Sequence, residues 1–129
     1  MIVDLRLYAI VDPAVAGGHT LTALTGLIAG RVTLLHLRDK YGGTRTMVEQ
    51  ARALRSALKP AGVPLLINDR VDVALASGED GVHIGQDDMS PQDARLLLGR
   101  NAIIGLSLST VRHAGEAPLD LVDYAGIGA

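Results

Sequence analysis

Short apolar runs alternate with longer amphipathic stretches along the chain, which is the pattern of strands that alternate with helices. Six runs are predicted strands: Leu7 to Val11, Thr33 to Leu37, Leu65 to Ile67, Gly81 to Ile84, Ile103 to Leu106 and Tyr124 to Gly128. Helices are predicted between them: Leu21 to Ala29, a segment capped by Thr44 and running to about Leu58, Val71 to Ala76, Pro91 to about Leu98, and one capped by Ser109 or Thr110. Repeated strand–helix–strand units indicate a parallel sheet with right-handed crossovers.

The residues that follow the strands favour a barrel over an open doubly wound sheet. An open sheet usually carries a glycine fingerprint after its first strand, whereas here that strand ends in Asp12-Pro13 and no P-loop sequence occurs. Polar residues follow several strands, which is how barrels assemble their sites. Complete (β/α)8 barrels need about 200 residues or more. We therefore expect one α/β domain, residues 1–129, that forms an incomplete (β/α)8 TIM barrel of about six βα units, without the last two.

The composition narrows the classes of function. The formal net charge is -2, and three Tyr are the only Phe, Trp or Tyr residues, so a nucleic-acid-binding surface is not expected. The absence of cysteine excludes thiolate chemistry and Cys-based metal sites. The sequence shows no signal-peptide pattern and no apolar run of the roughly 20 residues that a membrane span needs. We expect a cytoplasmic protein that binds neither nucleic acid nor membrane.

A basic cluster lies at the end of the second predicted strand. His36, Arg38 and Lys40 are spaced by two, so they share one face of the strand, and Leu35 and Leu37 face the helices. Arg offers a planar fork for phosphate oxygens and Lys adds a point charge. The pattern is consistent with phosphate binding or with salt-bridged charges at a strand end.

Carboxylates follow the third and fourth strands. Asp69, after Asn68, has two interpretations: a cap for the next helix or a ligand of magnesium, which prefers carboxylate oxygens. Asp88 is not needed as a cap, because Ser90 is the better one. Since the two strands are neighbours, both carboxylates could reach one metal ion.

Two further polar residues belong to this set. His83 should point inward by alternation with Val82 and Ile84, although an isolated core histidine is more often structural. Ser107 follows the fifth strand and could donate to a phosphate. No HExxH zinc motif and no GxSxG elbow occurs, which excludes those two kinds of hydrolase.

Several segments together resemble the thiamine-phosphate synthase family, over nearly the whole chain and in the family's order. They are LYAIVD (residues 7–12), HLRDK (36–40), NDRVDVALA (68–76), DGVHIGQDDM (80–89), IGLS (104–107) and DYAGIG (123–128). The resemblance implies that Arg38, Lys40 and Asn68 bind the pyrophosphate of the pyrimidine substrate. It also implies that Asp69 and Asp88 hold Mg²⁺ on that pyrophosphate.

The resemblance implies roles for three more residues and for the whole chain. His36 would line the pyrimidine pocket together with His83, and Ser107 would contact the pyrophosphate or the pyrimidine amine, with Arg38, Lys40 and Ser107 acting in catalysis. The implied reaction couples 4-amino-2-methyl-5-hydroxymethylpyrimidine pyrophosphate with thiazole phosphate, giving thiamine phosphate and pyrophosphate. Pyrophosphate leaves first, and the thiazole nitrogen captures the resulting carbocation, so no protein nucleophile is needed.

The family pattern departs from this chain at its end, where the family continues with a Thr-x-Thr-Lys segment and glycine-rich loops that hold the thiazole phosphate. We therefore expect the isolated 129-residue chain to be inactive and its open edge strands to favour association, including a homo-oligomer. Two alternatives stay open: a thiazole tautomerase-like relative, which shares the NDR-V-D segment, and a catalytically inactive barrel fragment that acts only by association.

Overall fold

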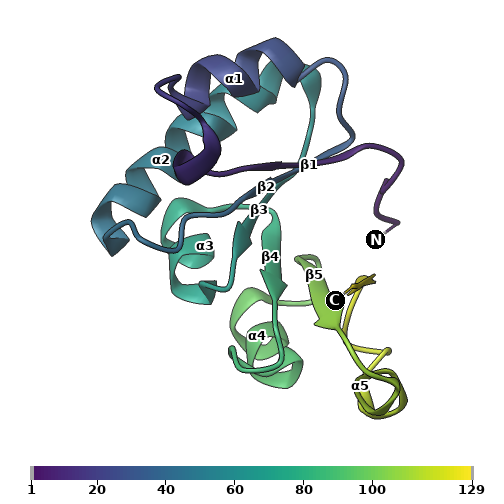
Figure 1. Cartoon of the computed structure of the whole chain (residues 1–129). Coiled ribbons are helices and arrows are strands. Elements are labelled where there is room, and N and C mark those ends of the chain that lie inside the picture. Colours follow the sequence, from purple (N-terminus) through teal and green to yellow (C-terminus); the bar gives the residue numbers. More distant parts are fainter. Residues whose placement is uncertain (1, 129) are drawn as a thin grey trace.

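One parallel sheet contains all six predicted strands in the computed structural model, which describes residues 2–128 (Figure 1). Its strand order is β1-β2-β3-β4-β5-β6. The strands are β1 (Tyr8–Val11), β2 (Leu34–Leu37), β3 (Leu65–Asn68), β4 (Gly81–Ile84), β5 (Ile103–Leu108) and β6 (Tyr124–Ile127). Each strand pairs in parallel with the next one along the chain, as successive βα units of a barrel wall do. The predicted α/β class is confirmed, with six parallel strands in a half-barrel.

Helices connect the strands close to the predicted positions. They are α1 (Leu21–Ile28), α2 (Thr44–Leu58), α3 (Val71–Ser77), α4 (Pro91–Leu98) and α5 (Val111–Glu116), with 3-10 turns η1 (Pro13–Val15) and η2 (Lys59–Ala61). The hydroxyls of Thr20, Ser90 and Thr110 accept backbone N–H bonds at their helix starts, as N-caps do. Thr44 is not a cap as predicted, because it is already the first helical residue of α2 and Gly43 takes the cap position.

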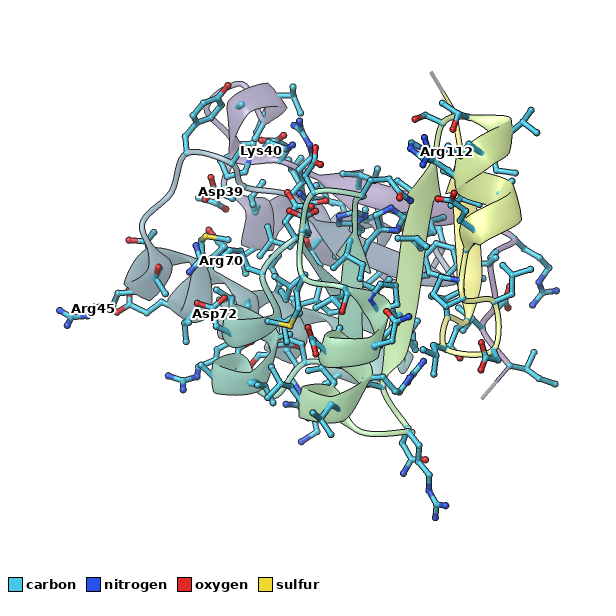
Figure 2. All side chains as sticks on the ribbon, turned by 90° about the horizontal axis from the view of Figure 1, so that it is seen from below. Asp39, Lys40, Arg45, Arg70, Asp72 and Arg112 are labelled. Carbon is cyan, nitrogen blue, oxygen red and sulfur yellow. The ribbon has the colours of Figure 1, made fainter. Side chains whose placement is uncertain are left out.

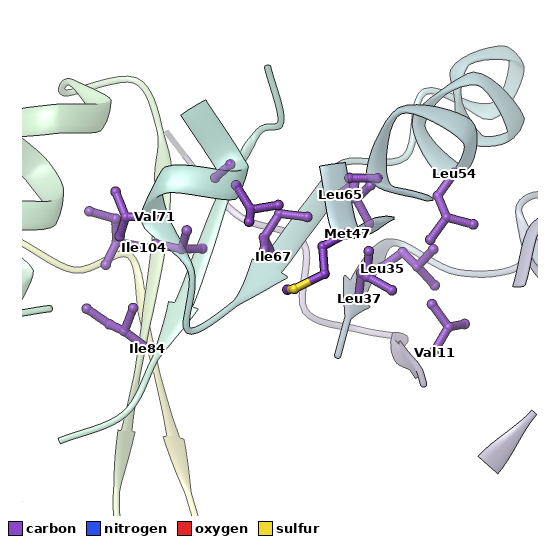
Figure 3. Close-up of a cluster of buried hydrophobic side chains, with 14 of the residues drawn as sticks. Val11, Leu35, Leu37, Met47, Leu54, Leu65, Ile67, Val71, Ile84 and Ile104 are labelled. Carbon is purple, nitrogen blue, oxygen red and sulfur yellow. The ribbon is translucent and has the colours of Figure 1, made fainter. Parts of the chain in front are cut away.

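The main core lies between the outer face of the sheet and the helices. Leu35 and Leu37 of β2 point into it, as the alternation predicts, and they are almost completely buried. Helix α2 contributes Met47 and Leu54 to the same cluster (Figure 3). Because burying a Leu side chain stabilises a fold by about 1.5–3 kcal/mol, this layer holds the strands in place while leaving their inner face to other side chains.

The inner face carries a second, smaller cluster. Leu34, Leu66 and Ile103 are buried there, against Tyr8 and Tyr124. Within residues 2–128, β1 and β6 each pair with one strand only, yet the hydroxyls of Tyr8 and Tyr124 lie 2.8 Å apart. The inward side chains of the two edge strands therefore pack against each other at Tyr8 and Tyr124. The sheet curls far enough for its edges to meet through side chains.

Two glycines allow this curvature. A β-carbon on Gly81 would lie 1.8 Å from the carbonyl oxygen of Ile103, so β4 and β5 can approach only with glycine there. A β-carbon on Gly105 would lie 2.1 Å from the ring of Tyr124. Gly105 thereby leaves the space that the Tyr124 ring occupies over β5.

The helices of the described residues are all too short or too polar to cross a membrane.

Candidate functional site at the carboxyl ends of the strands

The basic residues after β2 both have carboxylate partners. Arg38 donates from Nη1 to Oδ2 of Asp12 at the end of β1, over 2.6 Å, and the Asp12 side chain is almost fully buried. A hydrogen bond from the backbone N–H of Ala14 and then the Arg38 pair lower the pKa of Asp12. Asp12 is a site residue that sequence reasoning did not select, although its place at a strand end was the available signal. The interpretation of Arg38 as a salt-bridged residue is therefore correct, since its Nη1 pairs with Asp12. An anion that binds Arg38 would have to bind beside this ion pair.

Lys40 lies 3.8 Å from Oδ2 of Asp69, a loose contact between two partly exposed groups. Such a pair contributes about 1 kcal/mol or less, so the ammonium group can also bind an anion. Figure 2 shows Lys40 with Asp39 and Arg70 at one side of the molecule, in the loops that follow β2 and β3. These three residues line one cavity of about 170 Å³, together with Asn68 and Asp69.

Asp69 has the one positive φ of a non-glycine residue in the described part of the chain, at 65°. This left-handed conformation costs about 1–3 kcal/mol, and residues strained in this way cluster at active sites and ligand-binding segments. It directs Asp69 away from helix capping: Arg70 takes the cap position of α3, and no side chain caps that helix. The capping interpretation of Asp69 is therefore wrong.

Asp88 lies close enough to Asp69 to affect the pKa of the Asp69 carboxyl group. Burial, and then hydrogen bonding to and repulsion by Asp88, raise the pKa of Asp69 to about 6. Oδ2 of Asp88 also accepts the backbone N–H of Gly85 over 2.7 Å, which closes the loop after β4. Two carboxylates that repel each other are the donor set that a hard cation stabilises. Residues 2–128 contain no cluster of three or more His, Cys, Asp or Glu residues that could hold a metal, so a cation here would need further oxygens from water or a ligand.

The predicted inward histidines lie side by side on the inner face. His36 and His83 have ring centroids 5.3 Å apart, and each ring also packs near a tyrosine. Burial lowers the pKa of His36 to about 4, and burial also lowers the pKa of His83. Both rings are therefore neutral near pH 7.

Hydrogen bonds connect these rings to the strand-end residues. Nε2 of His36 lies 2.8 Å from Oδ1 of Asn68, and Nε2 of His83 lies 2.7 Å from Oγ of Ser107. The opposite ring nitrogens reach the two tyrosine hydroxyls. The tyrosines border a mostly apolar cavity of about 320 Å³, lined also by His36 and His83.

The structure thus brings the sequence-predicted residues to one end and one face of the half-barrel. Asn68 lines the cavity of about 170 Å³ that contains Lys40 and Asp69, called the charged cavity below. Asn68 also lies within hydrogen-bond distance of His36, which lines the apolar cavity. Sequence reasoning did not select Tyr8 and Tyr124, although alternation along their strands could have placed both on the inner face.

Known proteins that resemble the chain agree on one family. The family described as Thiamine monophosphate synthase matches residues 7–129. The chain is 49% identical over 126 residues to the thiamine-phosphate synthase of Xanthobacter autotrophicus, covering 97% of this chain and 60% of that protein. It is 52% identical over 128 residues to the thiamine-phosphate synthase of Agrobacterium fabrum, covering 98% of this chain and 58% of that protein.

A solved structure supports the same conclusion. The thiamine phosphate pyrophosphorylase from Pyrococcus furiosus superimposes with a TM-score of 0.83 at 33% sequence identity, over 97% of this chain and 60% of that one. The chain therefore spans about 60% of the length of the relatives that it matches. The matching segments, the strand order and the superposition together show that this chain belongs to the thiamine monophosphate synthase family.

Proposed function

We propose that this chain provides the pyrimidine pyrophosphate site of a thiamine-phosphate synthase, a transferase that couples pyrimidine pyrophosphate with thiazole phosphate. The observation that carries the proposal is the position of Asn68, which joins a charged cavity with Lys40 and Asp69 to a neutral aromatic cavity with His36. A ligand with a pyrophosphate at one end and a heteroaromatic ring at the other matches this arrangement. The names of the relatives support the same assignment.

The charged side of the site would bind the leaving group. The guanidinium of Arg38 and the ammonium of Lys40 place two positive charges beside the departing pyrophosphate, where charge develops in the transition state. Asp69 and Asp88 would hold Mg²⁺, which adds positive charge next to the same phosphates when bound. Their mutual repulsion is the reason to expect a cation between them.

The aromatic side would hold the pyrimidine ring. Departure of pyrophosphate leaves a positive charge on the pyrimidine methylene carbon, and the thiazole nitrogen then forms the new bond to that carbon. Neutral rings at His36 and His83 serve this step, because a protonated imidazole would repel the developing cation. Ser107 would contact the substrate next to His83.

The test is binding of pyrophosphate in the presence of magnesium, measured by calorimetry on the wild-type chain and on two variants. Arg38→Lys keeps the charge but loses the bidentate fork, so we expect at least tenfold weaker binding. Arg45→Lys is the matched control, because Arg45 is exposed on α2 and extends away from the site (Figure 2). Equal affinity of the wild type and Arg38→Lys would contradict the assignment.

Product formation distinguishes the proposed synthase from the tautomerase-like alternative. In a full-length enzyme that contains these residues, thiamine phosphate should form from the two substrates with magnesium. Tautomerisation of the thiazole without coupling would support the alternative.

A further inference from the structure

A continuous chain of hydrogen bonds crosses the inner face of the sheet and takes one residue from each of the six strands. Five contacts of 2.6–2.8 Å join the six residues in this order: Asn68, His36, Tyr8, Tyr124, His83 and Ser107. The two ends of the chain, on β3 and β5, are residues of the proposed substrate site. The two tyrosines in its middle have no role in the proposal above.

The direction of the first bonds follows from the chemistry of the end group. Oδ1 of Asn68 can only accept, so Nε2 of His36 must carry the proton that it receives. A neutral imidazole has a single N–H, so Nδ1 of His36 accepts, and the donor is the hydroxyl of Tyr8 at 2.6 Å. Burial raises the pKa of Tyr8, so this hydroxyl keeps its proton.

The remaining directions follow one from another. The single proton of Tyr8 is committed to His36, so Tyr8 accepts from the hydroxyl of Tyr124 at 2.8 Å. With its own proton committed in turn, Tyr124 accepts from Nδ1–H of His83 at 2.8 Å. Nε2 of His83 is then an acceptor, and Ser107 donates to it at 2.7 Å. One acceptor at Asn68 therefore determines the direction of all five bonds.

Contacts between the aromatic rings accompany this row of hydrogen bonds. The ring of Tyr124 lies edge-on to that of Tyr8 at a centroid distance of 5.8 Å, and 5.5 Å from that of His83. Gly105 gives the Tyr124 ring its space, and a β-carbon on Gly126 would come within 3.3 Å of Cε1 of His83. The absence of side chains at these two glycines thus leaves the space that the rings of Tyr124 and His83 occupy.

We infer that Tyr8 and Tyr124 are positioning residues, which couple the two histidines so that His36 carries its proton on Nε2 and His83 on Nδ1. The inference rests on the proposed function, since it assigns how the substrate site is organised. The amide N–H groups of Asn68 stay available to an anionic group, and Ser107 presents its oxygen lone pairs to an N–H donor. These six hydrogen-bonded side chains thereby orient a phosphorylated heteroaromatic amine, with its anionic group at Asn68 and its amine at Ser107.

The test is the tautomeric state of each histidine, read from long-range ¹⁵N–¹H correlations of the imidazole rings at about pH 8, where histidine is neutral. The wild type should show one tautomer at each inner ring, protonated on Nε2 in His36 and on Nδ1 in His83. In Tyr8→Phe the hydroxyl of Tyr124 loses its acceptor and can donate to Nδ1 of His83 instead. We therefore expect His83 to gain the Nε2–H tautomer, although no hydrogen bond joins Tyr8 to His83.

Control and second variants make the result specific. Tyr41→Phe removes a hydroxyl from a 90% exposed side chain and should leave both inner histidines unchanged. Tyr124→Phe removes the acceptor of His83 directly, so His83 should lose its preference for a proton on Nδ1 in this variant too. This variant provides the test if Tyr8→Phe does not fold. The ring signals of His19 and His113 serve as internal references in every variant.

Two results would overturn the inference. The opposite tautomers in the wild type would refute the assigned direction, and an unchanged His83 in the folded tyrosine variants would refute the coupling. The measurement uses neither substrate nor magnesium. It can therefore fail while pyrophosphate binding holds, and it can succeed while pyrophosphate binding fails, so the two proposals are tested separately.

Discussion

The carboxyl group of Glu79, in the loop between α3 and β4, makes the stability of this protein depend on pH. Both of its oxygens are buried and have no hydrogen-bond partner among residues 2–128. The nearby hydroxyl of Ser77 is already used, since it donates to the carbonyl oxygen of Val73 over 2.6 Å. Burial raises the pKa of Glu79 to about 7, against a smaller lowering effect of Arg55, and Asp80 adds to the rise.

The sign of the effect follows from proton binding. In the folded protein Glu79 holds its proton up to about pH 7, whereas in the unfolded chain it loses it near pH 4.5. The folded state therefore binds more protons between these values, and the free energy of unfolding falls as pH rises through this window. At about 1.4 kcal/mol per pKa unit the full difference is about 3 kcal/mol. Because the residue is only partly buried as a whole, solvent screening reduces the expected effect to about 1–2 kcal/mol.

The assay is urea unfolding of the wild type and of Glu79→Gln at about pH 5 and at about pH 8. The first value lies near the lower end of this window and the second lies above its upper end. Glutamine has the same shape without the charge, so we expect the variant to be about 1–2 kcal/mol more stable at the higher pH. At the lower pH most of that advantage should disappear. Other titrating groups, such as Asp69, are common to both proteins and cancel in the difference.

Glu49→Gln is the matched control, because Glu49 is an exposed residue of α2 and its replacement should give no pH-dependent difference. A stability difference between wild type and Glu79→Gln that is the same at both pH values would refute the reasoning. It would mean that the buried carboxyl finds a partner or water in solution.

Three further predictions concern the site and the sheet. Asp88→Asn should lower the pKa of Asp69 below its value of about 6, observed by ¹³C NMR titration without metal, and an unchanged pKa would show that burial alone sets it. Gly105→Ala should destabilise the protein by more than about 2 kcal/mol in thermal or urea unfolding, since the ring of Tyr124 must move. Gly115→Ala should be neutral or stabilising, because outside its own helix no atom of residues 2–128 lies within 4 Å of the new methyl group. Equal effects of the Gly105 and Gly115 substitutions would contradict the packing. Within residues 2–128 the outer edges of β1 and β6 are unpaired, so two copies can associate there. The mass measured by light scattering should therefore rise with protein concentration, and a monomer at all concentrations would contradict this.

Local patterns in the sequence were sufficient for the strands, the helices and the strand-end residues. Alternation placed Leu35 and Leu37 outward and His36 inward, because a strand directs successive side chains to opposite faces. The polar residues after the strands were predicted to share a site, because the carboxyl ends of parallel strands meet at one edge. The resemblance to the synthase family was visible in the same segments, and the comparisons confirm it.

The tertiary structure alone decided the features that depend on curvature and burial. Tyr8 and Tyr124 are 116 positions apart, and they meet only because the six strands curl until their inner side chains touch. The pairing of Arg38 with Asp12 and the left-handed backbone at Asp69 likewise depend on how loops from different strands pack together. The same holds for Glu79, whose charge looks ordinary in the sequence and becomes costly only where the fold buries it. Periodicity in the sequence shows which face of the sheet a side chain takes. The distance between side chains on the first and last strands depends instead on how far the whole sheet curls.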